Sequence, residues 1–102
     1  MRKTLESKVE AYLRVELHKI GLECMKYIPD HSVGMPDRMV VLPGRQVLWV
    51  EVKTDGGKLS EIQKYRHAWL RQAGHDVRVV WSKEQVDDLV RELIDERIAA
   101  VK

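Results

Sequence analysis

The chain has 102 residues, of which 44% are hydrophobic and 33% are charged. This length and composition exclude a disordered chain and leave room for one hydrophobic core, so we expect a single globular domain over residues 1–102. The net charge of +2 is too small to indicate nucleic-acid binding by itself. A nucleic-acid-binding surface would have to be a local basic patch.

The first predicted element is a helix from Thr4 to Ile20, ended by Gly21. Its apolar stripe consists of Leu5, Val9, Tyr12, Leu13, Leu17 and Ile20. Two glutamates flank this stripe: Glu6 lies about 60° from its centre and Glu10 about 100°, so Glu6 is better placed to reach inward. The alternative is that both glutamates form a solvated edge.

A short strand from Leu22 to Ile28 follows, then a loop from Pro29 to Gly34 that is rich in turn-forming residues. Cys24 is the only cysteine, which excludes an internal disulfide, and we expect it to pack as a small core residue. His31 is interpreted as a loop residue because no second His or Cys stands at a metal-ligand spacing.

The next stretch predicts a hairpin of two strands. Arg38 to Pro43 is rich in Val and Leu, Gly44-Arg45 is a turn signal, and Gln46 to Lys53 alternates with period two. Gly34 and Pro36 bend and stiffen the chain just before the first strand. Successive side chains of a strand point to opposite faces. One face of the second strand therefore carries Gln46, Leu48, Val50 and Val52, and the other carries Val47, Trp49, Glu51 and Lys53.

Two carboxylates belong to the same end of this hairpin. Asp37 precedes the first strand and Glu51 lies near the end of the second, so antiparallel pairing brings them together. Carboxylate and water oxygens suit Mg²⁺, which commonly works beside phosphate oxygens. The neighbouring Lys53 could orient or help deprotonate an attacking water, or stabilise negative charge on the phosphate. The pattern indicates metal-dependent phosphodiester hydrolysis.

A helix from Ser60 to about Ala73 comes next, with Ser60 as its N-cap. Gln63 fits the reciprocal partner of a capping box. The basic residues of this region fit either phosphate contacts or a solvated face; they are Lys58, Lys64, Arg66, His67 and Arg71. We expect the packing face to consist of Ile62, Trp69 and Leu70, joined by Tyr65 and Ala73.

The chain ends with a strand from Val77 to Trp81 and a helix that a second capping-box pattern, Ser82 with Gln85, begins. We expect the tail from Arg97 to Lys102 to fray. The order helix, strand, strand, strand, helix, strand, helix predicts an α/β fold around a mixed sheet. The strands on either side of the Ser60 helix should be parallel, with a right-handed crossover.

Several of these residues together carry a family resemblance: Gly34-Met35-Pro36-Asp37-Arg38, Glu51-Val52-Lys53, Gly57-Lys58-Leu59-Ser60 with Gln63, and Gly74 before a Val-rich strand. Pro36-Asp37 followed after thirteen residues by Glu51-Val52-Lys53 resembles the PD-(D/E)xK nuclease signature. With its flanks, the set resembles the virus-type replication-repair nuclease (VRR-NUC) domain. The likeness runs from about Glu6 to about Leu93, nearly the whole chain.

The resemblance implies a metal site. Asp37 and Glu51, with the Val52 carbonyl, would hold Mg²⁺ or Mn²⁺, and Lys53 would act on the water. Members of the family carry an acidic residue early in the first helix that completes this site. Glu6 matches that position best, and Glu10 is the alternative.

Members also carry a glutamine that points to the active site from the helix after the Glu-x-Lys strand, a role that would fall to Gln63. The implied fold is a restriction-endonuclease-like mixed sheet flanked by helices. The implied activity is that of an endodeoxyribonuclease that cuts structured or branched DNA in replication and repair.

Free-standing phage and bacterial members are similar to homodimeric Holliday-junction resolvases. The implied partners are a four-way DNA junction and a second copy of the chain, and exposed aromatics would suit that interface; the candidates are Tyr12, Tyr27, Trp69 and Trp81. With no signal peptide and no bilayer-spanning apolar run, we expect a cytoplasmic protein of a bacterium or phage with no membrane partner. The alternatives are a restriction or mobile-element nuclease subunit, and a non-catalytic DNA-binding module that kept the fold.

Overall fold

The computed structural model describes residues 5–28, 33–54 and 56–101, with side chains as far as residue 97. The predicted helix start at Thr4 and the interpretation of His31 lie outside the described residues. The elements are α1 (Leu5–Lys19), β1 (Cys24–Lys26), β2 (Arg38–Val40), β3 (Leu48–Val52), α2 (Glu61–Gln72), β4 (Asp76–Val80) and α3 (Lys83–Val101). This order confirms the predicted α/β fold. Over the described ranges, no helix is both long and apolar enough to cross a membrane.

The four strands form one mixed sheet in the order β1, β2, β3, β4. The pairs β1 with β2 and β2 with β3 are antiparallel. β4 pairs with β3 in parallel, as the α2 crossover predicted. The sheet places β3 between β2 and β4, so the strand that carries Glu51 is a central one.

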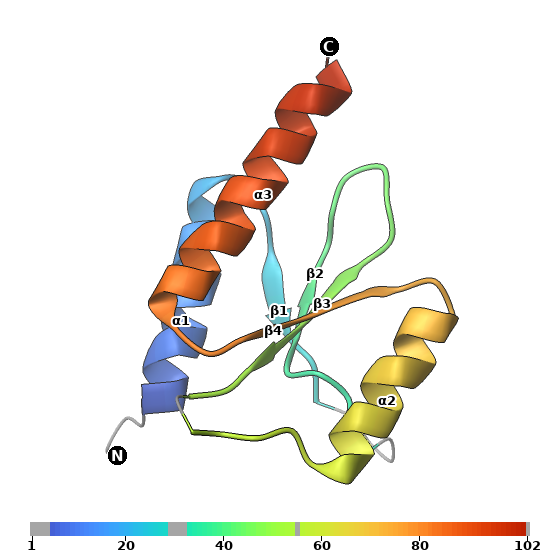
Figure 1. Cartoon of the computed structure of the whole chain (residues 1–102). Helices are drawn as coiled ribbons and strands as arrows, with labels where there is room; N and C mark the ends of the chain where they lie inside the picture. The colour runs from blue at the N-terminus through green and yellow to red at the C-terminus, as the bar shows by residue number, and fades with distance from the viewer. Residues whose placement is uncertain (1–4, 29–32, 55, 102) are drawn as a thin grey trace.

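Helices cover both faces of the sheet (Figure 1). α1 and α3 lie together over one face, and α2 lies over the other. The main core fills the first side, where Leu48, Val50 and Val52 of β3 pack with residues of α1 and α3. Trp49 packs on the α2 side with Leu70 and Val77. The alternation predicted for β3 is confirmed, and Glu51 follows Trp49 toward α2 because side-chain direction repeats every two residues.

The β2–β3 hairpin is shorter than the sequence predicted. β2 ends at Val40 rather than Pro43, and β3 begins at Leu48 rather than Gln46. Proline has no N–H to donate to a sheet ladder, which ends the strand before Pro43. The turn itself is where we expected it, since Gly44 has a φ of 74° and the Arg45 N–H donates to the Leu42 carbonyl at 3.3 Å.

β1 and the last strand also differ from their predicted bounds. β1 covers only Cys24–Lys26 of the predicted range Leu22 to Ile28, and β4 is Asp76–Val80 rather than Val77 to Trp81. Cys24 is buried with a free thiol, as expected of a core residue. The strands are therefore limited to the residues that pair with a neighbouring strand. An apolar pattern alone does not predict which residues those are.

The packing face of α2 was predicted correctly at Leu70 and wrongly at the other positions. Ile62, Tyr65 and Trp69 are exposed, at 42%, 60% and 47%, whereas His67 and Leu70 are buried. The inward face runs through positions 63, 67 and 70, which lie on one stripe because the helix turns by about 100° per residue. The neighbouring stripe, through positions 62, 65 and 69, faces solvent.

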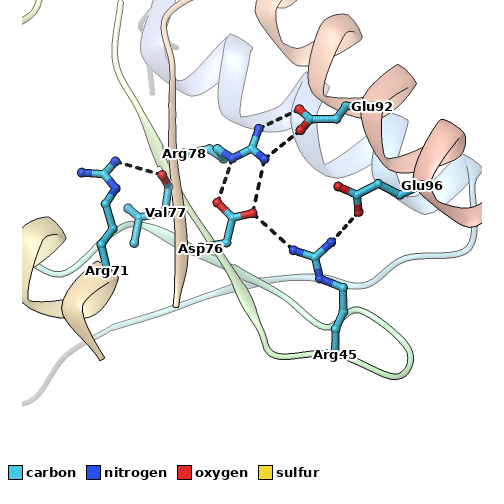
Figure 2. Close-up of polar contacts among 7 residues, drawn as sticks. All are labelled: Arg45, Arg71, Asp76, Val77, Arg78, Glu92 and Glu96. Carbon is cyan, nitrogen blue, oxygen red and sulfur yellow. Dashed lines mark hydrogen bonds and ion pairs between the residues drawn. The ribbon is translucent and has the colours of Figure 1, made fainter. Parts of the chain in front are cut away.

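A polar network joins the end of the sheet that is remote from Glu51 to α3 (Figure 2). Arg45, in the hairpin loop, forms ion pairs with Asp76 of β4 and Glu96 of α3. Arg78 binds Asp76 and also Glu92, at 2.8 and 2.7 Å. Partly exposed ion pairs stabilise by only about 0–1 kcal/mol each, so this network mainly fixes how the loop, β4 and α3 meet.

The C-terminal helix continues to Val101, beyond Arg97, where we expected it to fray. Arg97 Nη1 donates a hydrogen bond to the Ile20 carbonyl at 2.9 Å, which ties this part of α3 to the end of α1. At the other end of α3, the Gln85 N–H donates to Ser82 Oγ as predicted. Gln85 Oε1, however, accepts from the Trp81 N–H, one residue earlier than a capping box requires.

Candidate active site

The hairpin register brings Asp37 and Glu51 together. Arg38 pairs with Val50, and the same register continued by one residue places Asp37 opposite Glu51. Asp37 is held there by its own bonds, because its Oδ2 accepts a hydrogen bond from the Val52 N–H at 3.1 Å and its carbonyl accepts one from the Tyr27 N–H at 2.8 Å. The two carboxylates thus meet where β3 leaves the sheet toward α2.

Glu51 is the buried member of this pair, with only 2% of its surface exposed. Burial, and next the neighbouring Asp37 carboxylate, raise the pKa of Glu51 to about 8, although Lys53 acts in the opposite direction. Its Oε1 has no hydrogen-bond partner among the described residues. A buried carboxylate oxygen beside a second carboxylate is an unfavourable arrangement for the protein alone, and a bound cation would relieve it.

The Gln63 side chain makes two sets of contacts, one with Ser60 and one with Glu51. Its Oε1 accepts from the Ser60 N–H at 2.9 Å while its own N–H donates to Ser60 Oγ at 3.2 Å, which completes the capping box. At the same time its Nε2 donates to Glu51 Oε2 at 3.4 Å. The amide group has an acceptor and a donor, so one side chain caps α2 and reaches the site.

His67 is a site residue that the sequence interpretation missed. We placed it among basic residues that fit either phosphate contacts or a solvated face, but it is 1% exposed and its Nε2 lies 3.6 Å from Glu51 Oε1. Burial, and next the charge of Arg71, lower the pKa of His67. Its spacing of four residues from Gln63 was the available signal, because positions i and i+4 share one face of a helix.

Glu10, the alternative for the fourth acidic position, is bound elsewhere. Its carboxylate accepts hydrogen bonds from Lys26 at 2.9 Å and from Arg38 at 2.8 Å. Burial favours its neutral form, but these two cations outweigh burial and lower the pKa of Glu10. Two cations already neutralise this carboxylate, which leaves it little capacity for a metal.

Glu6 is half-buried, and its charge contributes to the raised pKa of Glu51. It therefore lies within electrostatic reach of the pair. No group of three or more His, Cys, Asp or Glu side chains comes together as a metal-binding set over residues 5–28, 33–54 and 56–97. Asp37 and Glu51 meet, but Glu6 does not join them at ligand distance.

The donor set still fits a hard divalent cation. Mg²⁺ is often bound through one or two carboxylates, with waters and substrate phosphates completing its octahedron, rather than by a cage of protein ligands. Asp37 and Glu51 supply two such carboxylates, and the unpartnered Oε1 of Glu51 is a ready ligand atom. The residues that are present fit the metal that the sequence implied.

Gly34 lets the loop before Asp37 pack against α2. Its φ is +83°, and a Cβ placed on it would lie 2.5 Å from the Ile62 carbonyl oxygen. Arg66 Nε donates to the neighbouring Val33 carbonyl at 3.0 Å. The backbone requirement predicted for Gly34 is confirmed, and it fixes the approach of Asp37 to the helix that carries Gln63 and His67.

The basic residues of α2 are divided between structural contacts and solvent. Arg71 donates to the Val77 carbonyl at 2.9 Å (Figure 2), and the Arg66 guanidinium lies over the rings of Tyr65 and Trp69. Lys58 and Lys64 are exposed, although Lys64 contacts Glu61 at 3.3 Å. Of the described basic residues of this region, Lys58 and Lys64 are thus exposed in the loop before α2 and on its first turn.

Comparisons with known proteins agree with the fold that carries this site. No family model matches the chain. The chain is 37% identical over 84 residues to "Putative nuclease p44" of Acyrthosiphon pisum secondary endosymbiont phage 1, a match that covers 82% of this chain and 90% of the relative. A solved structure titled "VRR_NUC domain" matches with a TM-score of 0.81 and 32% identity, covering 87% of this chain and 97% of that one. Sequence and fold carry the same likeness over most of the chain.

Proposed function

Because the chain belongs to the VRR-NUC family of nucleases, we propose that it is a metal-dependent endonuclease that hydrolyses phosphodiester bonds in DNA at the Asp37–Glu51 pair. The observation that carries this proposal is the buried Glu51 carboxylate, whose Oε1 has no hydrogen-bond partner among the described residues and which lies opposite Asp37 in the hairpin. Such a pair is costly in the free protein and becomes favourable around a divalent cation.

Asp37, Glu51 and the Val52 carbonyl would hold Mg²⁺ or Mn²⁺. When bound, the metal supplies a Lewis acid that polarises the phosphate and lowers the pKa of a water. Val52 also holds Asp37 in place through its N–H. Gln63 fixes the second oxygen of Glu51, so the two carboxylates are oriented before any ligand arrives.

Lys53 leaves the sheet two residues after Glu51, and its N–H donates to the Val80 carbonyl at 2.9 Å. Its charge lowers the pKa of Glu51, which puts it within electrostatic reach of the pair. In this position the lysine side chain can orient the attacking water, help deprotonate it as the neutral amine, or as the ammonium group stabilise the charge that develops on the phosphate. Glu6 would complete the site by moving inward when metal and DNA bind.

The substrate that we propose is structured or branched DNA, such as a four-way junction, in replication and repair. A small domain that meets DNA mainly through phosphate contacts reads backbone and shape more readily than base sequence. Exposed Lys58 and Lys64 beside the site can contact phosphates.

Resolution of a four-way junction requires two symmetric incisions, whereas one chain offers one site. We therefore propose a homodimer with two-fold symmetry. Trp69, one of the aromatics expected at an interface, is 47% exposed, and Tyr65 and Ile62 are exposed beside it on α2. Exposed aromatic side chains of this kind suit the centre of a protein interface.

The experiment that tests this function is a cleavage assay on a four-way junction, a flap, a duplex and single-stranded DNA, each with Mg²⁺, Mn²⁺ or a chelator. We expect paired incisions in the junction with metal and none with chelator. Asp37→Ala, Glu51→Ala and Lys53→Ala should each abolish cleavage while circular dichroism shows a folded protein. Full activity in any of the three, or cleavage in the chelator, would contradict the assignment.

Two alternatives give different outcomes in the same assay. A non-catalytic DNA-binding module would bind the junction and cut nothing under any metal condition. A restriction or mobile-element nuclease subunit would cut only when a partner subunit is added, or would cut duplex as well as junction DNA.

A further inference from the structure

Three buried polar atoms of one small region have no hydrogen-bond partner among the described residues. They are Oε1 of Glu51 and both ring nitrogens of His67. Both side chains are almost fully buried, at 2% and 1% exposure. An unpaired buried polar atom destabilises the folded protein, so the meeting of three in one place requires an explanation.

The helix α2 presents two side chains to the same carboxylate. Gln63 and His67 are four residues apart and face the sheet together. Gln63 Nε2 donates to Oε2 of Glu51 at 3.4 Å, and His67 Nε2 lies 3.6 Å from the other oxygen, Oε1. A small approach would bring the His67 contact into the hydrogen-bond range of about 2.7–3.2 Å.

We propose that His67 is a positioning residue for the metal site: its neutral imidazole donates Nε2–H to Glu51 Oε1 and fixes the carboxylate so that its remaining lone pairs face the cation. This inference rests on the proposed function, because it assumes a divalent cation at the Asp37–Glu51 pair. No bond is made or broken by His67 itself. It acts through Glu51, as partners of metal ligands commonly do.

The sharpest test compares two variants of similar shape. The amide nitrogen of glutamine stands about as far along its side chain as imidazole Nε2, so His67→Gln keeps a donor, whereas His67→Met fills similar space without one. Mn²⁺ binding to the DNA-free protein is measured by calorimetry, together with the melting temperature in chelator. We expect His67→Met to weaken Mn²⁺ binding about 10-fold or more and His67→Gln to remain within about 3-fold of wild type.

A residue that only fills the core would give another result. His67→Met would then bind Mn²⁺ as tightly as wild type, and that outcome overturns the proposal. Failure of the proposed function looks different: wild type would not bind Mn²⁺, or Asp37→Asn would bind it equally well. Binding by wild type, loss in Asp37→Asn and unchanged binding in His67→Met would remove the role of His67 alone.

A second measurement observes the His67 ring directly in the wild-type protein. A long-range proton–nitrogen spectrum of the wild-type protein with saturating Mg²⁺ reports which ring nitrogen carries the hydrogen, and the spectrum of His67→Gln identifies the signal of His67. We expect the hydrogen on Nε2. A hydrogen on Nδ1, with Nε2 unprotonated toward Glu51, would overturn the proposal.

Discussion

Glu51 is the residue on which the site depends, because the protein buries its charge without giving it a full set of partners. Only Gln63 donates to it in the described structure, and Asp37 stands beside it. Sequence spacing predicted that the two carboxylates would meet. It could not predict the burial of Glu51, which depends on how α2 closes over the end of β3.

The first prediction concerns stability in the absence of metal. The folded-state pKa of Glu51 is raised from 4.5 to about 8, so the folded protein resists ionisation that the unfolded chain accepts. Metal-free wild type should therefore lose stability as pH rises from about 5 through about 8. Glu51→Gln lacks this ionisation and should be more stable than wild type at pH 8 by on the order of 4 kcal/mol, since the pKa rises from 4.5 to about 8 and one pKa unit corresponds to about 1.4 kcal/mol.

Urea unfolding in chelator at pH 5 and pH 8 measures this difference. The gap between Glu51→Gln and wild type should be small at pH 5 and grow by pH 8. An equal gap at both values would mean that the Glu51 carboxylate ionises freely in the folded protein.

The second prediction separates Glu6 from Glu10. Glu6→Gln should reduce cleavage more than Glu10→Gln. Glu10 is held in ion pairs with Lys26 and Arg38, whereas the charge of Glu6 helps to raise the pKa of Glu51. Glu10→Gln should instead lower stability by about 1 kcal/mol, as expected when a partly buried ion pair is broken. The reverse order of cleavage rates would assign the fourth acidic position to Glu10.

At the scale of elements, the sequence predicted the features that side-chain alternation and helix-capping residues determine. The alternation of β3 set which side chains face α2, and the Ser60 to Gln63 spacing set the start of α2. It did not predict which stripe of α2 packs inward. Apolar content favoured the stripe with Ile62 and Trp69, but the polar stripe with Gln63 and His67 is the one turned to the sheet, because the buried carboxylate of Glu51 takes polar partners there.

Gly34 gives a prediction that belongs to this scale. Gly34→Ala should destabilise the fold by more than about 2 kcal/mol, because the new methyl group would strain a positive φ and also meet the Ile62 carbonyl. Gly21→Ala is the matched control: Gly21 has the same φ of +83° but open space around its Cβ position. Thermal unfolding of both variants isolates the cost of the contact, and equal losses would show that α2 and the Gly34 loop do not pack closely.

Two features of the described chain, the proposed catalytic pair and the exposed stripe of Ile62, Tyr65 and Trp69 on α2, lead to a prediction about assembly. Sedimentation at micromolar concentration should give twice the monomer mass of 11.9 kDa. Trp69→Glu, which puts a charge in the proposed interface, should give a monomer that nicks one strand of a junction without the paired incision. A wild-type mass near 11.9 kDa, with and without junction DNA, would remove the dimer and the paired mechanism.

The central claim is that Asp37 and Glu51 together hold a divalent cation, and crystals soaked in Mn²⁺ test it most directly. Anomalous scattering locates Mn²⁺ without reference to activity. We expect an anomalous peak within ligand distance of both carboxylates in the wild-type protein, about 2.0–2.3 Å from their oxygens, and its absence in Asp37→Asn. No peak at this pair, under Mn²⁺ concentrations that support DNA cleavage in solution, would contradict the account.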